Sequence, residues 1–283
     1  MSAETGATSI HADSPLARRN PAVKLGLLTA VSLVAVFLLD PVTPAVLYVL
    51  ALAAVAASVR APARTLALAH IPFALFAVGI LVVNVLTRPG TVLWQAGPLR
   101  VTAEGLEIGA ALAIRTLLIG VLAVGFLLST DGVALMTSLH QNVRLGPRLT
   151  YAVLAGYRML QEMPREWATI RAAHAVRTGE GRGARVPGHR EDPGNRGAPV
   201  PRGPRHLAGA VFALLVVSVR KGERMAQALE ARGLGLSPRS TWRPVRVTRA
   251  DWLMVATAAA VVAAVIGASA WLGQLDGPAV LFG

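Results

Sequence analysis

The sequence predicts an all-α, polytopic membrane protein with about five transmembrane helices and a helical cytoplasmic domain inserted before the last of them. Apolar residues make up 54% of the 283 residues, aromatic residues make up only 5%, and the mean hydropathy is +0.54. This composition is typical of Ala-, Val- and Leu-rich membrane spans and not of a water-soluble domain. The apolar residues are gathered into long runs, and most of the basic residues lie between the last two of them.

Five apolar runs have the character of transmembrane helices. They cover residues 25–39, 42–59, 66–86, 106–128 and 251–272. The first holds about 15 uncharged residues where roughly 20 are needed to cross a bilayer, so we expect Lys24 to extend it by snorkelling. Asp40 and Pro41 predict a turn between the first two spans, and the Gly- and Pro-containing segment 87–105 predicts an interfacial loop.

The charges predict the topology and the domain boundaries. Residues 129–249 hold 20 of the 28 Lys and Arg residues but only 8 of the 15 acidic residues. By the positive-inside rule this region is cytoplasmic, and the basic residues before the first span place the N-terminus on the same side. The expected divisions are a cytoplasmic tail over 1–23, a four-span bundle over 24–129, cytoplasmic helices over 130–249, and a last span with a short tail over 250–283.

The expected cytoplasmic region contains two helical patterns separated by a linker. The first pattern opens at Pro147, and Pro164 predicts a kink or a break within it. Residues 179–205 contain 7 Gly, 5 Pro and 6 Arg and almost no apolar residues, so they predict a flexible linker. The second pattern begins with an apolar run over 207–219, which is too short to span a bilayer and predicts a helix buried in protein or lying in the membrane interface.

The second helical pattern ends at Gly233, a residue type that readily adopts the left-handed conformation that stops helices. Arg232 therefore belongs to the last turn, where a guanidinium complements the negative end of the helix dipole and presents a rigid fork of donors. Ala231 and Gly233 are too small to block the close approach of a partner. We interpret residues 228–233 as a docking tip, and an ordinary C-capping arginine is the alternative.

Arg115 is the only clear charge inside a predicted span. A guanidinium at that depth costs at least about 2.5 kcal/mol, so we expect it to face other helices and to pair with Glu104, Glu107 or Asn84. It would serve either a substrate or proton relay or the packing of the helices. With no second buried charge, packing is the favoured interpretation.

Several classes of site are excluded or disfavoured by the sequence. There is no cysteine, hence no disulfide, thiolate metal site or thiol nucleophile. No phosphate-binding loop of the form G-x-x-x-x-G-K-[ST] occurs, so we do not expect the chain to hydrolyse ATP itself. No metal site or cofactor is expected, because no acids, histidines or cysteines stand at ligand spacing. The arginine-rich linker lacks aromatic residues to stack on bases, so we expect contact with lipid headgroups and not with nucleic acid.

Two other classes of membrane protein remain as alternatives. A lipid-linked transferase would need acid clusters that hold Mg²⁺ or an activated nucleophile. The acids are scattered, and the nearest pair, Glu162 and Glu166, is expected to form surface ion pairs with Arg158 and Arg165. A secondary transporter would need intramembrane carboxylates or two related halves, and neither is visible in the sequence.

The layout resembles the transmembrane T component, the EcfT and CbiQ-like family, of energy-coupling factor (ECF) transporters. The resemblance rests on Asn20-Pro21 to Lys24, Arg115, Ser129-Thr130, Pro147, and a helix ending at Arg177. Its most specific part is 228–233, because two coupling helices in this family each end in an Ala-Arg-Gly-like tip that docks into an ATPase groove. Ala231-Arg232-Gly233 matches the second tip in full. Val176-Arg177-Thr178 keeps the arginine of the first tip but replaces its alanine and glycine.

The resemblance implies a non-catalytic coupling subunit of an ABC-type importer in a bacterial or archaeal plasma membrane. Its implied partners are two ABC-type ATPase subunits, which would hydrolyse the ATP, and a small substrate-binding membrane subunit, the S component. The implied cargo is a vitamin or a transition metal ion such as nickel or cobalt.

Overall fold

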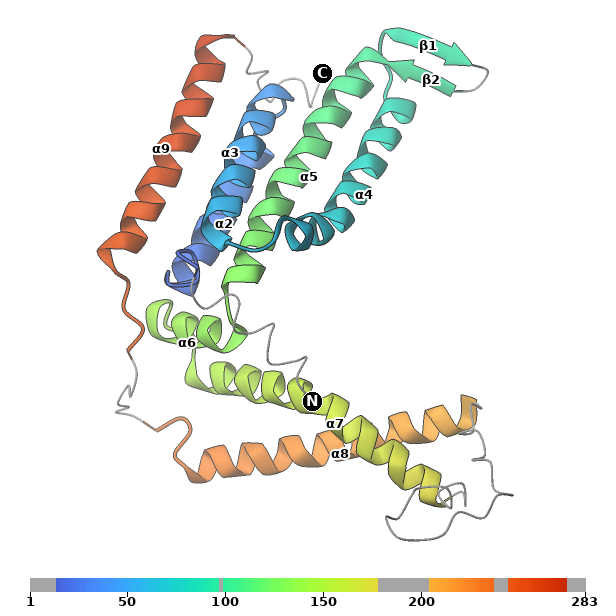
Figure 1. Ribbon diagram of the computed structural model, residues 1–283, viewed down its shortest axis with the longest axis vertical. Helices are drawn as coiled ribbons and strands as arrows, with labels where there is room; N and C mark the ends of the chain where they lie inside the picture. The colour runs from blue at the N-terminus through green and yellow to red at the C-terminus, as the bar shows by residue number, and fades with distance from the viewer. Residues whose placement is uncertain (1–13, 97–98, 178–203, 237–243, 274–283) are drawn as a thin grey trace. The chain divides into compact units, whose positions relative to one another are not determined.

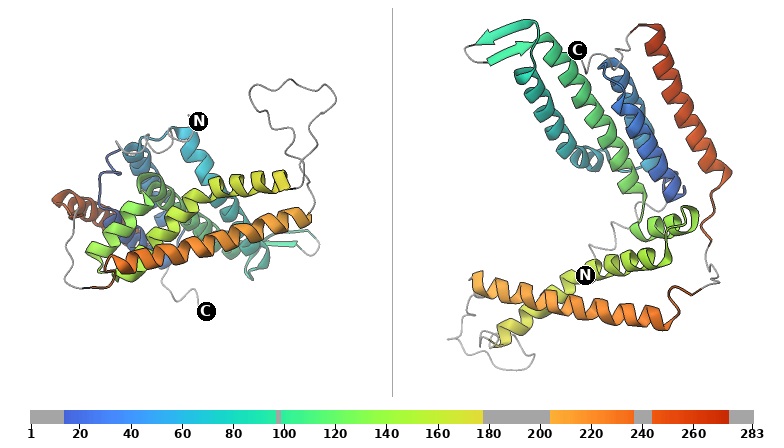
Figure 2. Two further views of the ribbon diagram at one scale, coloured as in Figure 1. Left: turned by 90° about the horizontal axis from the view of Figure 1, so that it is seen from below. Right: turned by 180° about the vertical axis from the view of Figure 1, so that it is seen from behind.

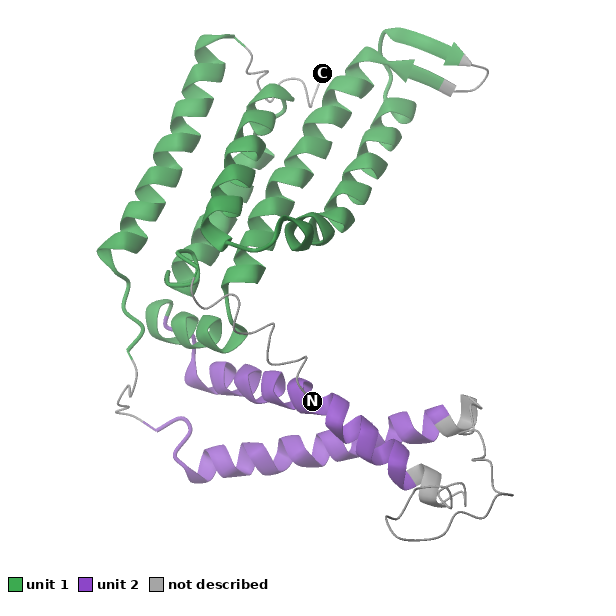
Figure 3. Cartoon of the chain, viewed as in Figure 1, with its two compact units in different colours: residues 1–143, 244–283 green, residues 144–243 purple. Residues whose placement is uncertain are grey.

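The computed structural model describes residues 14–96, 99–177, 204–236 and 244–273 (Figure 1). The chain divides into two compact units, the first formed by Met1–Val143 with Pro244–Gly283 and the second by Arg144–Arg243 (Figure 3). Apart from one two-stranded sheet, the regular structure of the described residues is helical. The predicted all-α, polytopic class is therefore confirmed.

The first unit is a bundle of long apolar helices with a short helix beside it (Figures 1 and 2). The helices are α2 (Pro21–Val36), α3 (Val42–Val59), α4 (Ala63–Thr87), α5 (Ala103–Ser129), α6 (Gly132–Asn142) and α9 (Arg249–Trp271). Among the described residues, α3, α4, α5 and α9 are long and apolar enough to cross a membrane, while α2 is a shorter apolar helix of 16 residues. Helix α5 contacts α2, α3 and α4, and α9 contacts α2 and α3.

Side-chain caps define where these helices begin. The Asn20 side chain accepts a hydrogen bond from the Ala22 amide, and Pro21 occupies the first helical position of α2, where no amide is needed. The turn predicted at Asp40-Pro41 is confirmed, and there the Asp40 carboxylate accepts from the Thr43 amide at 2.6 Å. At the start of α9, Thr248 and Asp251 form a reciprocal capping box.

Glycines on α5 let the neighbouring helices approach closely. A Cβ added at Gly120 would lie 2.6 Å from the Phe73 ring of α4, and one at Gly125 would lie 2.8 Å from Val55 of α3. In a bilayer, where lipid is as apolar as leucine, this close van der Waals contact is a main source of helix association. The buried core continues over Ala35, Leu38, Leu47 and Leu118.

The segment expected to be an interfacial loop contains a β-hairpin instead. Strands β1 (Val92–Ala96) and β2 (Leu99–Thr102) pair antiparallel, with Trp94 opposite Val101 (Figure 1). The sequence pattern did not reveal it because strands of four or five residues carry too little alternation to be distinguished from a loop. Trp94 is exposed on this hairpin, as expected for an aromatic residue at a membrane interface.

The second unit consists of two long helices that run in opposite directions and cross (Figures 1 and 2). Helix α7 covers Pro147–Arg177 and α8 covers Pro204–Ala231. Helix α7 continues through Pro164, so of the predicted kink or break at this residue the break is wrong. A proline removes one hydrogen bond, and the flanking turns keep theirs. Of the predicted linker 179–205, residues up to 203 lie outside the described part, and the last two belong to α8.

Candidate functional site

The second tip, residues 228–233, ends α8 with a well-formed Schellman motif. The Gly233 amide donates to the Glu230 carbonyl at 2.9 Å, and the Leu234 amide donates to the Leu229 carbonyl at 3.0 Å. Gly233 has a φ of +82°, which confirms the predicted left-handed helix stop. The motif satisfies carbonyls that a helix end otherwise leaves unpaired.

This helix end presents an arginine between two small residues. Ala231 and Arg232 are both exposed, and the Arg232 amide still donates to the Ala228 carbonyl at 3.3 Å, so the backbone under the guanidinium is fixed. Gly235 also has a positive φ, of +98°, and the Arg148 side chain at the start of α7 lies against it. The chain leaving the tip is therefore packed on the neighbouring helix.

Of the first tip, residues 176–178, the structure describes the backbone of Val176 and Arg177. Helix α7 ends at Arg177, where the resemblance placed the end of the first coupling helix. Thr178 lies outside the described residues. In the crossed pair, α8 begins near the end of α7 and ends near its start, so the two helix ends lie at opposite ends of the second unit (Figure 2).

Lys221 of α8 joins the two helices where they cross. Its ammonium donates to the Glu162 carboxylate, and to Oε1 of Glu166 at 3.2 Å. The hydrogen bond from Lys221 lowers the pKa of Glu162, and the hydrogen bonds to both carboxylates raise the pKa of Lys221. The expected pairing of these acids with Arg158 and Arg165 is corrected in part: their hydrogen-bonded partner is a lysine 59 residues away from Glu162, and the charges of the two arginines further lower the pKa of Glu162.

Helix α8 carries an exposed apolar stripe on the second unit. Its residues recur every fourth position, and each is more than half exposed: Leu207, Val211, Leu215 and Val219. Such spacing places them along one face of a helix. The run 207–219 was predicted to be buried in protein or to lie in the membrane interface, and among the residues that the structure describes its stripe is exposed. A contiguous apolar surface of this kind marks an interaction site.

Arg115 faces another helix as predicted, but with different partners. Its guanidinium donates to the Val36 carbonyl at 2.9 Å and to the Ala35 carbonyl at 3.4 Å. These carbonyls belong to the C-terminal end of α2, where a cation complements the helix dipole. The proposed pairing with Glu104, Glu107 or Asn84 is wrong, because the last turn of α2 leaves unpaired carbonyls that α5 brings within reach.

A buried polar cluster joins the beginnings of α2 and α9 to α5 and α6. Asp251 Oδ1 accepts from the Asn20 amide at 3.0 Å, and Ser138 Oγ donates to Asn20 Oδ1 at 2.6 Å. Lys24 Nζ donates to the Ser129 carbonyl at 2.8 Å. The family resemblance rested in part on Asn20, Lys24 and Ser129. It did not include Ser138 or Asp251. The Thr248-x-x-Asp251 capping pattern was the one signal that pointed to Asp251.

Among the described residues, no group of three or more His, Asp or Glu side chains is placed to hold a metal ion. Comparison with known families gives one match. The model of the family described as CbiQ, cobalt transport protein, matches residues 12–244, which include both tips and the helices from α2 to α8 but not α9. No curated protein matches the chain.

Proposed function

We propose, because the chain belongs to the CbiQ family of cobalt transport proteins, that it is the coupling subunit of an ECF-type ABC importer. It is a multi-pass plasma membrane protein and a membrane component of a transporter that works with other subunits. In the proposed role, two ABC-type ATPase subunits bind the tips of α7 and α8, and a small S component binds the substrate. The chain transmits the ATPase movements to the S component and does not itself catalyse a reaction.

The observation that carries this proposal is the geometry of the second tip. Arg232 is exposed at a helix end that a Schellman motif holds rigid, and its neighbours Ala231 and Gly233 allow a groove wall to approach. A guanidinium in this position can bind a carboxylate or two carbonyls bidentately, which fixes direction as well as contact. To transmit force, a pair of helices needs a directional attachment to its partner at each end.

The second unit supplies further support through its exposed stripe. Leu207, Val211, Leu215 and Val219 form a surface that needs a partner, and an apolar membrane protein such as the S component would cover it. Lys221 forms ion pairs with Glu162 and Glu166 where α7 and α8 cross, so the two helices are in contact and a displacement of one would reach the other. The family description favours cobalt as the cargo, and a vitamin remains the alternative.

The test compares four variants: Arg232→Ala, Arg177→Ala, the double alanine variant and Arg232→Lys. We expect Arg232→Ala to weaken ATPase binding by about 30-fold or more, since it removes a desolvated charged contact. Arg177→Ala should have a smaller effect, because Val176 and Thr178 should hold the first tip shallower in its groove. The double variant should abolish coupling, and Arg232→Lys should restore only part of it.

The measurements are ATP-driven cobalt uptake and co-purification of the ATPases, with the membrane level of each variant checked by blot. Arg224→Ala is the matched control, because Arg224 is an exposed arginine of the same helix that lies away from the tip. If the double alanine variant inserts normally, retains its ATPases and transports at near wild-type rates, the proposed docking role is wrong.

A further inference from the structure

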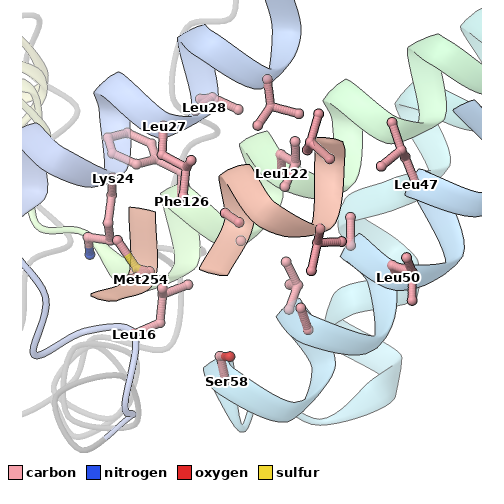
Figure 4. A pocket seen from close by; sticks show the side chains of 18 of the residues that line it. Leu16, Lys24, Leu27, Leu28, Leu47, Leu50, Ser58, Leu122, Phe126 and Met254 are labelled. Atoms are coloured by element: carbon pink, nitrogen blue, oxygen red, sulfur yellow. The ribbon is translucent and has the colours of Figure 1, made fainter. Parts of the chain in front are cut away.

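The first unit forms a half-open apolar cavity of about 460 Å³ between α2, α3, α5 and α9 (Figure 4). Leu16, Lys24 and Met254 lie at one end of it, where α2 and α9 begin, and Leu47 and Leu50 lie at the other. The Lys24 stem lines the wall, while its ammonium turns away to donate to Ser129. The walls are otherwise almost entirely aliphatic, so water would find few hydrogen-bond partners inside.

The cavity lies beside α9, which is hydrogen-bonded to the bundle near its two ends. Near the start of α9, Asp251 Oδ1 accepts from the Asn20 amide at 3.0 Å. Near its end, the Thr43 hydroxyl donates to Ser269 Oγ at 2.7 Å. Asp251 and Ser269 are the only buried residues of α9, and its middle faces the cavity. An apolar occupant of this space would add contacts for the middle of α9, where Val262 also packs against the core of the unit.

The charges at the two ends of the first unit identify the occupant. Exposed Arg60, Arg64 and Arg249 flank the end where α3 finishes and α4 and α9 begin, two to six positions from the lining residues Ser58 and Met254. The acids described at that end, Asp131 and Asp251, already accept hydrogen bonds from backbone amides. Basic residues around a crevice between transmembrane helices are the recognition pattern for anionic lipid headgroups.

We propose that the cavity is a binding site for an anionic phospholipid. One acyl chain fills the space between α9 and the helices α2, α3 and α5, and the phosphate is bound by Arg60, Arg64 and Arg249. The lipid completes the packing of the last span, so that the attachment of α9 depends on the headgroup charge of the surrounding membrane. This inference does not depend on ATPase docking.

The test uses the full chain in a neutral detergent with two added lipids of identical acyl chains, phosphatidylglycerol and phosphatidylcholine. We expect phosphatidylglycerol to raise the unfolding midpoint by about 3 °C or more and phosphatidylcholine to raise it much less. Native mass spectrometry should show one retained phosphatidylglycerol per chain. A phosphatidylglycerol with a photoactivatable acyl chain should label α3 and α9 peptides that line the cavity.

Matched variants test the acyl-chain site and the headgroup site separately. Ala258→Leu fills the cavity and should abolish retention and labelling, whereas Ala259→Leu adds the same side chain at an exposed position outside the lining and should not. Ala54→Leu, on the opposite wall, repeats the test should the first variant fail to fold. Replacing Arg60, Arg64 and Arg249 with Gln should weaken retention about tenfold. The same change at Arg88 and Arg100 should leave it intact.

Three results would overturn the proposal. One is equal stabilisation by the two lipids together with no effect of the triple Gln variant. Another is labelling that Ala258→Leu and Ala54→Leu leave unchanged. The third is loss of labelling when the chain is purified with its partner subunits, because a partner helix would then be the occupant.

Discussion

The two units of this chain bury their side chains to very different extents. In the first unit, α5 alone buries ten residues, and the surrounding helices are tied together by buried hydrogen bonds such as those of Asp251 and Lys24. In the second unit, only Thr150 and Ala210 are buried among the described residues, while α8 leaves its apolar stripe exposed. The first unit therefore has a buried core. The second unit instead has an ion pair between its two helices and an exposed apolar stripe on α8.

This difference shows where the stability of each unit comes from. A membrane bundle needs close packing and satisfied polar groups inside, and its apolar outer surface suits lipid. The crossed pair of α7 and α8 has no such buried core, and its exposed apolar face is of the kind that another protein or the membrane surface covers. We expect substitutions in the first unit to change stability and those on the second to change assembly.

The largest contrast should come from two leucine-to-alanine substitutions. Leu38→Ala empties a position buried in the core of the first unit and should lower the free energy of unfolding by about 2 to 5 kcal/mol. Leu215→Ala removes an exposed side chain of the α8 stripe and should leave the unfolding midpoint of the isolated chain unchanged. It should reduce co-purification of partner subunits. Equal destabilisation by the two substitutions, measured by thermal unfolding in detergent, would show that the stripe is covered within the chain.

A smaller effect is expected from enlarging glycines within the bundle. Gly120→Leu forces Phe73 away from α5 and should cost about 1 to 3 kcal/mol. Gly79→Leu on α4 is the control, because no atom lies within 4 Å of a Cβ added there. Unfolding midpoints of the two variants in the same detergent make the comparison. A Gly120→Leu variant as stable as the wild type would mean that Phe73 does not pack closely on Gly120.

The smallest effect should follow from Lys221→Ala, which removes an exposed ion pair. Such pairs contribute little to stability, so we expect faster hydrogen exchange in α7 near Glu162 and no change in the unfolding midpoint. The pKa of Glu162 is lowered by Lys221, so the contact is present at neutral pH and is lost as the pH falls through that lowered pKa. The wild-type and variant exchange rates should therefore converge in acid. Arg220→Ala, one position away, should leave exchange near Glu162 unaltered, and a difference that persists in acid would exclude the ion pair as its cause.

Local chemistry made several features of this protein predictable from its sequence. Long apolar runs predicted the spans, because the hydropathy of a helix is a property of about 20 consecutive residues. Gly233 predicted the end of α8, because a left-handed residue is needed for a Schellman motif and glycine adopts that conformation without a steric penalty. The arginine between two small residues at the second tip could also be identified, because the three residues are consecutive in the sequence.

Only the tertiary structure decided which distant groups meet. Arg115 binds the carbonyls of Ala35 and Val36 and not an acid on its own helix, and Lys221 binds Glu162 across 59 residues. The Asn20 amide and the Asp251 carboxylate join opposite ends of the sequence, 231 residues apart. The cavity beside α9 likewise depends on how four helices approach one another, whereas the hairpin of β1 and β2 is local but its strands are too short to show a pattern. Sequence periodicity reports the face that a helix buries, and the partner of that face is set by packing among helices whose order in space the sequence does not contain.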